Sequence, residues 1–90
     1  MESRHVRYFV ATAEAGTVSA AATREHVTQP GLSRQLRLLE QEIGVSLFDR
    51  CGGRLTLSRT GRELLPRARD LLSAAEALRT DAAFHAQGGI

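Results

Sequence analysis

A set of polar side chains near the middle of the chain has the types and spacing needed to recognise the edges of base pairs. Its members are Gln29, Pro30, Ser33, Arg34 and Arg37. Projected at about 100° per residue, they lie on a different face of a helix from its leucines, and no acid precedes Glu40 on that face. In the DNA major groove, Gln can pair with adenine and Arg with guanine through two hydrogen bonds each. The pattern therefore predicts a surface for double-stranded DNA.

Basic charge is concentrated in the second half of the chain. All twelve basic residues are arginines, and a GC-rich genome would explain the choice of Arg over Lys but not its placement. Six of them stand between residues 50 and 69 against a single acid, Glu63, whereas the segment from Asp70 onward is mildly acidic. They are Arg50, Arg54, Arg59, Arg62, Arg67 and Arg69. A pI near 9.5 with clustered arginine is typical of a nucleic-acid binder.

Other chemistries lack the residues they need. Cys51 is the only cysteine, which excludes an internal disulfide and a Cys-rich metal site. We expect it on the surface of the wing, the β-hairpin described below, redox sensing being the alternative. His5, His26 and His85 fall on separate elements without a metal-ligand spacing. No nucleophile motif and no Gly-rich phosphate loop is present, so neither an enzyme nor a cofactor is expected.

Three short helices are expected in the first half of the chain, and the polar face belongs to the third. The first is predicted over about 3–15, with Ser3 as its N-cap and Gly16 at its end. Thr17 and Thr28 suit the N-caps of the next two, and both could also contact phosphate because helix N-termini attract anions. The second and third helices would form a helix-turn-helix, whose second helix enters the major groove.

The third helix, predicted over 28–43, must bury one side while it presents the other to DNA. Its apolar residues recur at spacings of four, three and four along one stripe: Leu32, Leu36, Leu39 and Ile43. Gly31 costs about 0.5–1 kcal/mol relative to Ala inside this helix. That cost fits either the close approach of another molecule or a tolerated imperfection.

Two short extended runs around Gly52-Gly53, over 45–50 and 54–58, predict a β-hairpin. A two-stranded hairpin is marginal in water, so apolar side chains must hold it against the helices. The available ones are Leu47, Phe48, Leu55 and Leu57. As a wing over 50–57, the hairpin would carry Arg54 into the narrow minor groove. Arg50 would either contact DNA or brace the wing.

A long helix is predicted from about residue 59 to Gln87, with Pro66 inside it. Its apolar side chains follow a heptad at Leu64, Ala68, Leu71, Ala75, Leu78 and Ala82, and Leu65 and Leu72 widen the stripe. Three short helices cannot cover so long a stripe, so we expect it to pair two subunits; packing on its own domain is the alternative. The expected domains are a winged helix-turn-helix over 1–58 and a linker and dimerisation helix over 59–90.

Several motifs match a family pattern over almost the whole chain. The most specific run places Gln29-Pro30 ahead of Leu32-Ser33-Arg34-Gln35 and then Leu39-Glu40. Leu47-Phe48-Asp49-Arg50 and Leu57-Ser58-Arg59-Thr60-Gly61 also match. The chain resembles the N-terminal DNA-binding domain of LysR-type transcriptional regulators.

This resemblance implies a mainly α fold, in which three helices and a two-stranded wing precede a long linker helix. It further implies sequence-specific binding to promoter DNA as a homodimer, or as a tetramer in the full-length protein. A small-molecule inducer would bind an effector domain that is absent from this chain. Because no signal peptide or membrane-spanning run is evident, the expected location is cytoplasmic.

Three residues depart from the family pattern. Glu25 stands where an apolar residue is usual and is expected to point outward or toward an Arg such as Arg24. Ser3 replaces a common Leu, and Gly31 replaces Ala, Thr or Pro, so base preference near Gly31 should differ from that of relatives.

The predicted DNA contacts are Thr17, Thr28, Gln29, Pro30, Gly31, Ser33, Arg34, Arg37, Arg50 and Arg54. Arg37 has an alternative role, since Glu40 or Gln41 could pair with it. The alternative function is a winged helix that binds another protein, because fold alone does not determine function. A protein-binding module would more often expose apolar anchors, so the acid-free face and Arg54 favour DNA.

Overall fold

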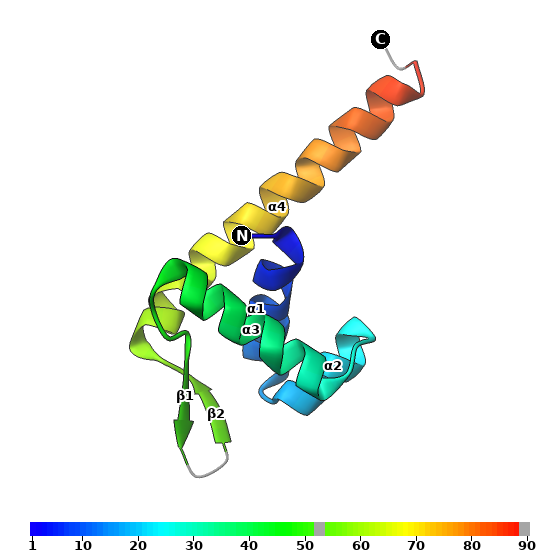
Figure 1. Ribbon diagram of the computed structural model, residues 1–90. Coiled ribbons are helices and arrows are strands. Elements are labelled where there is room, and N and C mark those ends of the chain that lie inside the picture. The colour runs from blue at the N-terminus through cyan, green and yellow to red at the C-terminus, as the bar shows by residue number, and fades with distance from the viewer. Residues whose placement is uncertain (52–53, 89–90) are drawn as a thin grey trace.

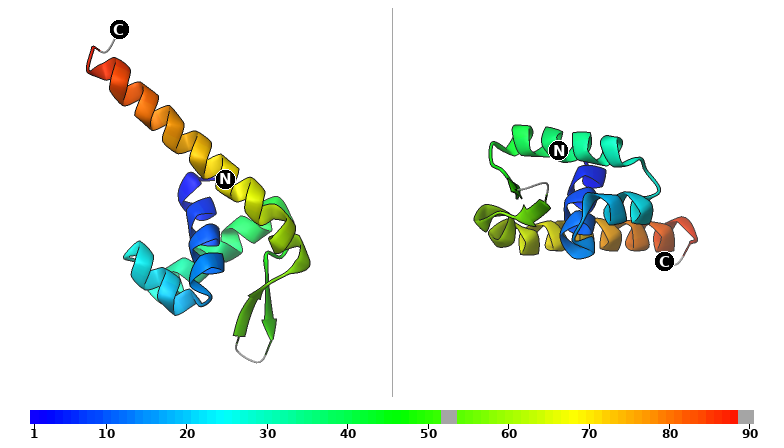
Figure 2. Two further views of the ribbon diagram at one scale, coloured as in Figure 1. Left: turned by 180° about the vertical axis from the view of Figure 1, so that it is seen from behind. Right: turned by 90° about the horizontal axis from the view of Figure 1, so that it is seen from below.

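The computed structural model describes residues 1–51 and 54–88 of the chain. The elements follow in the order α1 (Ser3–Ala15), α2 (Val18–Glu25), α3 (Gln29–Ile43), β1 (Phe48–Cys51), β2 (Arg54–Leu57) and α4 (Arg59–Ala86). Helices α1 to α3 form a compact head, from which the β-hairpin projects on one side and α4 extends away on another (Figure 1). Figure 2 shows α1 lying between α3 and α4. The expected winged helix-turn-helix architecture is confirmed.

The second and third helices are capped as their sequences predict. The Thr17 hydroxyl accepts the backbone N–H of Ala20 at 3.0 Å, and the Thr28 hydroxyl accepts that of Gly31 at 3.1 Å. Each bond satisfies a backbone donor that has no partner within the helix, which fixes where the helix starts. The start of α3, which carries the predicted base-contacting residues, is therefore set by a local bond.

The first helix differs from the prediction at its start. Its N-cap is Glu2, which makes no side-chain cap bond, and Ser3 is instead the first helical residue. The expected cap at Ser3 is therefore wrong, because the helix extends one residue further toward the N-terminus. Its end is as predicted: Gly16 adopts φ 83° and its N–H bonds to the carbonyl of Thr12.

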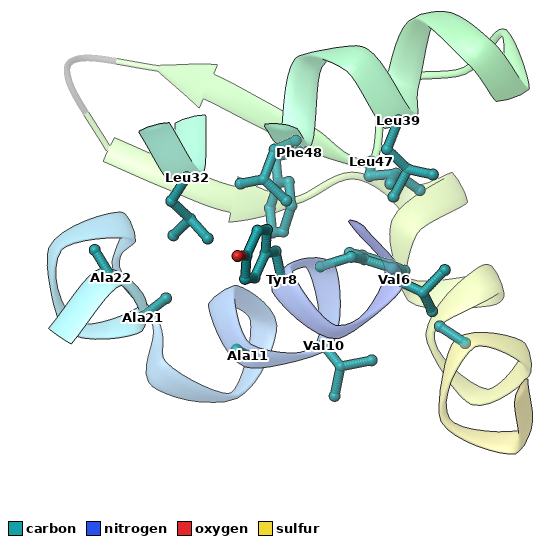
Figure 3. Packing of buried hydrophobic residues seen from close by; sticks show 13 residues of the cluster. Val6, Tyr8, Val10, Ala11, Ala21, Ala22, Leu32, Leu39, Leu47 and Phe48 are labelled. Atoms are coloured by element: carbon teal, nitrogen blue, oxygen red, sulfur yellow. The ribbon is translucent and has the colours of Figure 1, made fainter. Parts of the chain in front are cut away.

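The core of the head forms where α3 and the start of the hairpin pack onto α1. Its buried apolar members are Val6, Tyr8, Phe9, Val10, Ala11, Ala21, Ala22, Leu32, Leu36, Leu39, Leu47, Phe48 and Ala68. Figure 3 shows side chains from α3 and β1 converging on α1. The rings of Phe9 and Phe48 meet edge to face at 5.7 Å, a favourable aromatic geometry. Ile43, predicted on the same stripe, is 38% exposed because it ends α3 beside an open groove.

The two strands of the hairpin pair antiparallel, from Phe48 opposite Leu57 to Cys51 opposite Arg54. The first strand begins at Phe48, three residues later than predicted. The expected turn at Gly52-Gly53 lies outside the described residues. As expected, the hairpin is anchored by apolar side chains: Phe48 is buried with its neighbour Leu47, and Leu55 and Leu57 pack partly buried against the core.

Helix α4 starts in tight contact with the base of the hairpin. The carbonyl of Leu47 accepts the N–H of Ser58 at 2.9 Å, and the Ser58 hydroxyl accepts the N–H of Gly61 at 2.8 Å. A Cβ atom on Gly61 would overlap the Leu47 carbonyl, so only glycine permits this approach. From this anchor the helix continues through Pro66 to Ala86.

The first half of α4 packs on α1, and the second half extends beyond the head (Figure 1). Ala68 is buried, and Leu64, Leu65 and Leu72 are partly buried against the core. Within the described residues, no helix combines the length and the apolar composition needed to cross a lipid bilayer.

Candidate nucleic-acid interface

The exposed face of α3 carries the residues predicted to contact base pairs. Gln29, Pro30, Arg34 and Arg37 are exposed, and Ser33 is partly buried. Among the residues that the structure describes, neither Arg34 nor Arg37 has a carboxylate within ion-pair distance. This face therefore presents uncompensated positive charge, which favours a polyanionic ligand.

Arg37 does not pair with Glu40, one of the alternatives from the sequence. The Glu40 carboxylate is directed to the backbone of the segment that enters β1, where it accepts the N–H groups of Leu47 and Phe48. Arg37 is left on the outer surface beside Gln41, where both side chains are exposed. Its contact with DNA stays a prediction.

Gly31 lies in the first turn of α3, next to the Thr28 side chain that caps the helix. A Cβ atom at this position would lie 2.8 Å from Oγ1 of Thr28, the atom that caps the helix. A larger residue would therefore have to shift the threonine side chain. A hydroxyl that accepts one hydrogen bond can still donate another, so Thr17 and Thr28 both keep a donor for a phosphate oxygen.

A surface hollow of about 510 Å³ joins the start of α2, the start of α3 and strand β2. It is lined by Gly16, Thr17, Val18, Ser19, Gln29, Leu55 and Thr56. Ser19 and Thr56 were not among the residues expected from the sequence. The alternation of Leu55, Thr56 and Leu57 was the available signal, because alternate residues of a strand point to opposite faces. The hollow brings predicted contacts from the helix-turn-helix next to the wing.

The wing arginines occupy different places on the hairpin. Arg50 is exposed, and its Nη2 lies 3.9 Å from Oε1 of Glu40. Arg54 is the first residue of β2, opposite the exposed Cys51. The side chain of Arg54 lies outside the described residues, so its entry into the minor groove stays a prediction.

Two further arginines at the start of α4 make local contacts. Arg59 lies 3.7 Å from Glu63, one turn further along α4. Arg62 donates to the carbonyl of Leu57 at 3.0 Å and so helps to attach α4 to the hairpin.

One departure from the family pattern, Glu25, is accommodated by an ion pair between α1 and α2. Glu25 accepts a hydrogen bond from Nε of Arg7 at 2.7 Å, so it turns toward an arginine, one of the two expected outcomes, but its partner is Arg7 and not the suggested Arg24. Arg24 instead bonds to Glu14 at 3.0 Å, and Glu14 also receives Arg69 of α4 at 3.3 Å. The sequence could not show this choice, because these partners come from different helices.

The predicted dimer stripe changes in exposure along α4. Ala68 is buried in its own domain, and Leu64, Leu72 and Ala75 are partly buried. In contrast, Leu71 is 44% and Leu78 71% exposed, and Ala82 is exposed as well. Leu71 also borders an apolar groove of about 390 Å³ whose walls include Phe9, Ile43, Val45 and Leu64.

Within the described residues, no group of three His, Cys, Asp or Glu side chains is placed to hold a metal ion.

Comparison with known proteins gives consistent matches. The family model described as "Bacterial regulatory helix-turn-helix protein, lysR family" matches residues 3–62. The transcriptional regulator ClcR of Pseudomonas putida is 42% identical over 90 residues, which are 100% of this chain and 31% of that protein. The regulator TfdT of Cupriavidus pinatubonensis is 42% identical over 91 residues, 99% of this chain and 40% of that protein. The chain thus spans less than half the length of these relatives.

Two solved protein–DNA complexes contain a chain that resembles this one over at least 92% of its length. The BenM_DBD/catB site 1 DNA complex superposes with a TM-score of 0.91 at 34% identity, covering 100% of this chain and 97% of that one. The CbnR_DBD–DNA complex gives a TM-score of 0.81 at 42% identity, covering 92% of this chain and 98% of that one.

Proposed function

Because the chain belongs to the LysR family of bacterial regulatory helix-turn-helix proteins and is a DNA-binding domain of that type, we propose how it binds an operator. Helix α3 enters the major groove of a half-site, and the hairpin enters the adjacent minor groove. Helix α4 joins two copies of the chain, so that two half-sites are bound together.

The observation that carries this proposal is the outer face of α3. Its two guanidinium groups, on Arg34 and Arg37, have no carboxylate partner in the described part of the chain and so offer their donors to a ligand. Arg34 would bond to guanine and Gln29 to adenine, while Ser33 would donate to either. Pro30 would contact a thymine methyl or a sugar.

Phosphate contacts would come from both sides of the hollow between the helix-turn-helix and the wing. Thr17 and Ser19 stand on its helical side and Thr56 on its strand side. Hydroxyls and helix N-termini commonly bind phosphate and so fix a protein in register on the duplex. One sugar–phosphate strand would therefore run along this hollow while Arg54 enters the minor groove beyond it.

Dimerisation through α4 is supported by the apolar surface that the single chain leaves open. Leu71 and Leu78 are exposed along one stripe, and Leu71 borders the apolar groove between α1, α3 and α4. Isolated exposed leucines are common, but a stripe continuous with an apolar groove marks an interaction surface. A second copy of α4 would cover it.

The regulatory part of the proposed function is suggested by the greater length of the relatives. The regulators ClcR and TfdT extend well beyond the part that this chain matches. We propose that a small-molecule inducer acts on such a further part in the whole protein, and that the chain described here needs no cofactor to bind DNA.

The test is to select bound duplexes with the purified chain from fragmented genomic DNA or a random-sequence pool, and then to footprint the selected site. We expect a paired site and an affinity that falls steeply between low and moderate salt, because bound phosphates release counterions. Failure to enrich any sequence, or binding that ignores salt, would contradict the proposal.

A further inference from the structure

The side chain of Glu40 connects α3 to the segment that enters the hairpin. Its Oε2 accepts the backbone N–H of Leu47 at 2.7 Å and that of Phe48 at 3.3 Å. Its Oε1 lies 3.9 Å from the guanidinium of Arg50, two residues into the hairpin. A single carboxylate therefore touches three positions of the segment from Leu47 to Arg50.

The surroundings of this carboxylate make its bonds stronger than those of a surface ion pair. The Glu40 side chain is 12% exposed, whereas that of Glu42, which pairs with the N-terminal ammonium, is 51% exposed. Hydrogen bonds to an ionised acceptor are stronger than neutral ones, and shielding from water strengthens them further. Exposed pairs such as that of Glu42 contribute little.

The hairpin depends on such attachments for its orientation. Two strands alone are marginal in water. Strand β2 is fixed separately, through Ser58 and the close approach of Gly61 to Leu47. Ser58 also bonds to the carbonyls of Ser46 and Leu47, and Glu40 adds a second polar link to the segment that enters β1, directly from the helix proposed to enter the major groove. Removing the Glu40 carboxylate would let the angle between the hairpin and α3 vary, while the hairpin stays attached to the head.

We propose that Glu40 is a positioning residue for DNA recognition, which holds the hairpin at a fixed angle to α3. This inference rests on the proposed function. Ser33 and Glu40 are seven residues apart and so lie on the same side of α3. One side of α3 therefore carries Ser33, proposed to face the bases, near the N-terminal end of the helix, and Glu40, which contacts the hairpin, near its C-terminal end. Contacts in the major and minor grooves are then made together, because one rigid unit carries both.

The experiment compares Glu40→Ala and Glu40→Gln with Glu42→Gln as a matched control. The control removes the same charge from the same helix, two residues away, without touching the hairpin. The probe is a fluorescent duplex carrying the site that the parent chain selects from a random-sequence pool. It is made with A·T or with G·C pairs flanking the half-site, because a narrow A·T minor groove attracts an inserted arginine. In a third version, one base pair of the half-site is replaced by another Watson–Crick pair that the parent does not prefer.

We expect the parent and Glu42→Gln to prefer the A·T flanks. Glu40→Ala should bind both flanks about equally, because a loosely held wing gains little from a narrow groove. It should still bind the half-site with the substituted base pair about tenfold more weakly than the selected half-site, because α3 continues to read the bases. Glu40→Gln should be intermediate, because its amide oxygen can accept both N–H groups without the charge.

Partial unfolding would weaken the preference for A·T flanks and the preference for the selected half-site together. Thermal unfolding followed by circular dichroism shows whether each variant is folded at the assay temperature. If Glu40→Ala is unfolded there, Glu40→Gln carries the test. The inference is wrong if the folded variants keep the parent's flank preference, if both discriminations fall in parallel, or if the parent has no flank preference. A parent that selects no duplex at all refutes the proposed function as well.

Discussion

Helices α3 and α4 are both amphipathic, yet the single chain completes the packing of only one of them. Leu32, Leu36 and Leu39 of α3 are at most 2% exposed, whereas Leu71 and Leu78 of α4 are 44% and 71% exposed. The apolar side of α3 is covered by α1, α2 and the start of the hairpin, so its other side is free to contact a ligand. The apolar side of α4 packs on α1 in the first half of the helix, but its second half extends past the head and has no cover within the described chain. In the proposed function, α3 therefore contacts DNA and α4 packs against a second copy of the chain.

The largest effect is expected from a charge placed in the exposed apolar stripe of α4, where a second copy of the chain is proposed to pack. Leu71→Glu should shift the chain to monomers, because an uncompensated charge buried in an interface costs about 3–5 kcal/mol. Sedimentation velocity should show the smaller species, and affinity for a paired operator should fall with it. Glu76→Gln, which changes an exposed charge on the same helix, is the control. An unchanged sedimentation coefficient for Leu71→Glu would show that α4 does not form the dimer interface.

A matched pair of leucine truncations sharpens the contrast within one chain. Leu36→Ala should lower the free energy of unfolding by about 2–5 kcal/mol, because it leaves a cavity in the core of the head. Leu78→Ala should change it by less than about 0.5 kcal/mol in the monomer, where the side chain is already largely in water. Urea unfolding at concentrations low enough to suppress association measures both. Equal losses would mean that the two helices are packed alike.

On the outer face of α3, Arg34→Ala should weaken binding by about 1–3 kcal/mol and relax the preference at one base position. Competition between the selected duplex and single-base variants, followed by fluorescence anisotropy, measures both effects. Arg79→Ala, on the distal part of α4, should leave the base preference intact. Specificity unchanged in Arg34→Ala would exclude it from base recognition.

The smallest effect is expected at the wing. Arg54→Ala should weaken binding without changing the bases that α3 prefers, and it should reduce the magnitude of the negative slope of log K against log salt by about one, because one cationic contact is lost. Titrations at several salt concentrations give the slope. A parent-like slope would indicate that Arg54 does not approach the DNA backbone.

Much of the head could be predicted because its determinants are local. A threonine that caps a helix bonds three residues ahead, and a leucine stripe follows the helical repeat, so Thr17, Thr28 and Leu32 act within their own segments. The exposed polar face of α3 follows from the same repeat, because burying one side of a helix exposes the other. The failures at Ser3 and Ile43 fall at helix ends, whose exact positions and cover the helical repeat does not fix.

The amino-acid sequence by itself thus determined the family, the order of elements and the face of α3 proposed to contact DNA. Only the tertiary structure decided which distant groups meet: Glu40 with the backbone before the hairpin, Glu25 with Arg7, and the first half of the α4 stripe with α1. The physical reason is range. Caps and periodicity depend on residues three or four apart, whereas these contacts depend on how whole segments pack and on how far each side chain reaches across the gap between them.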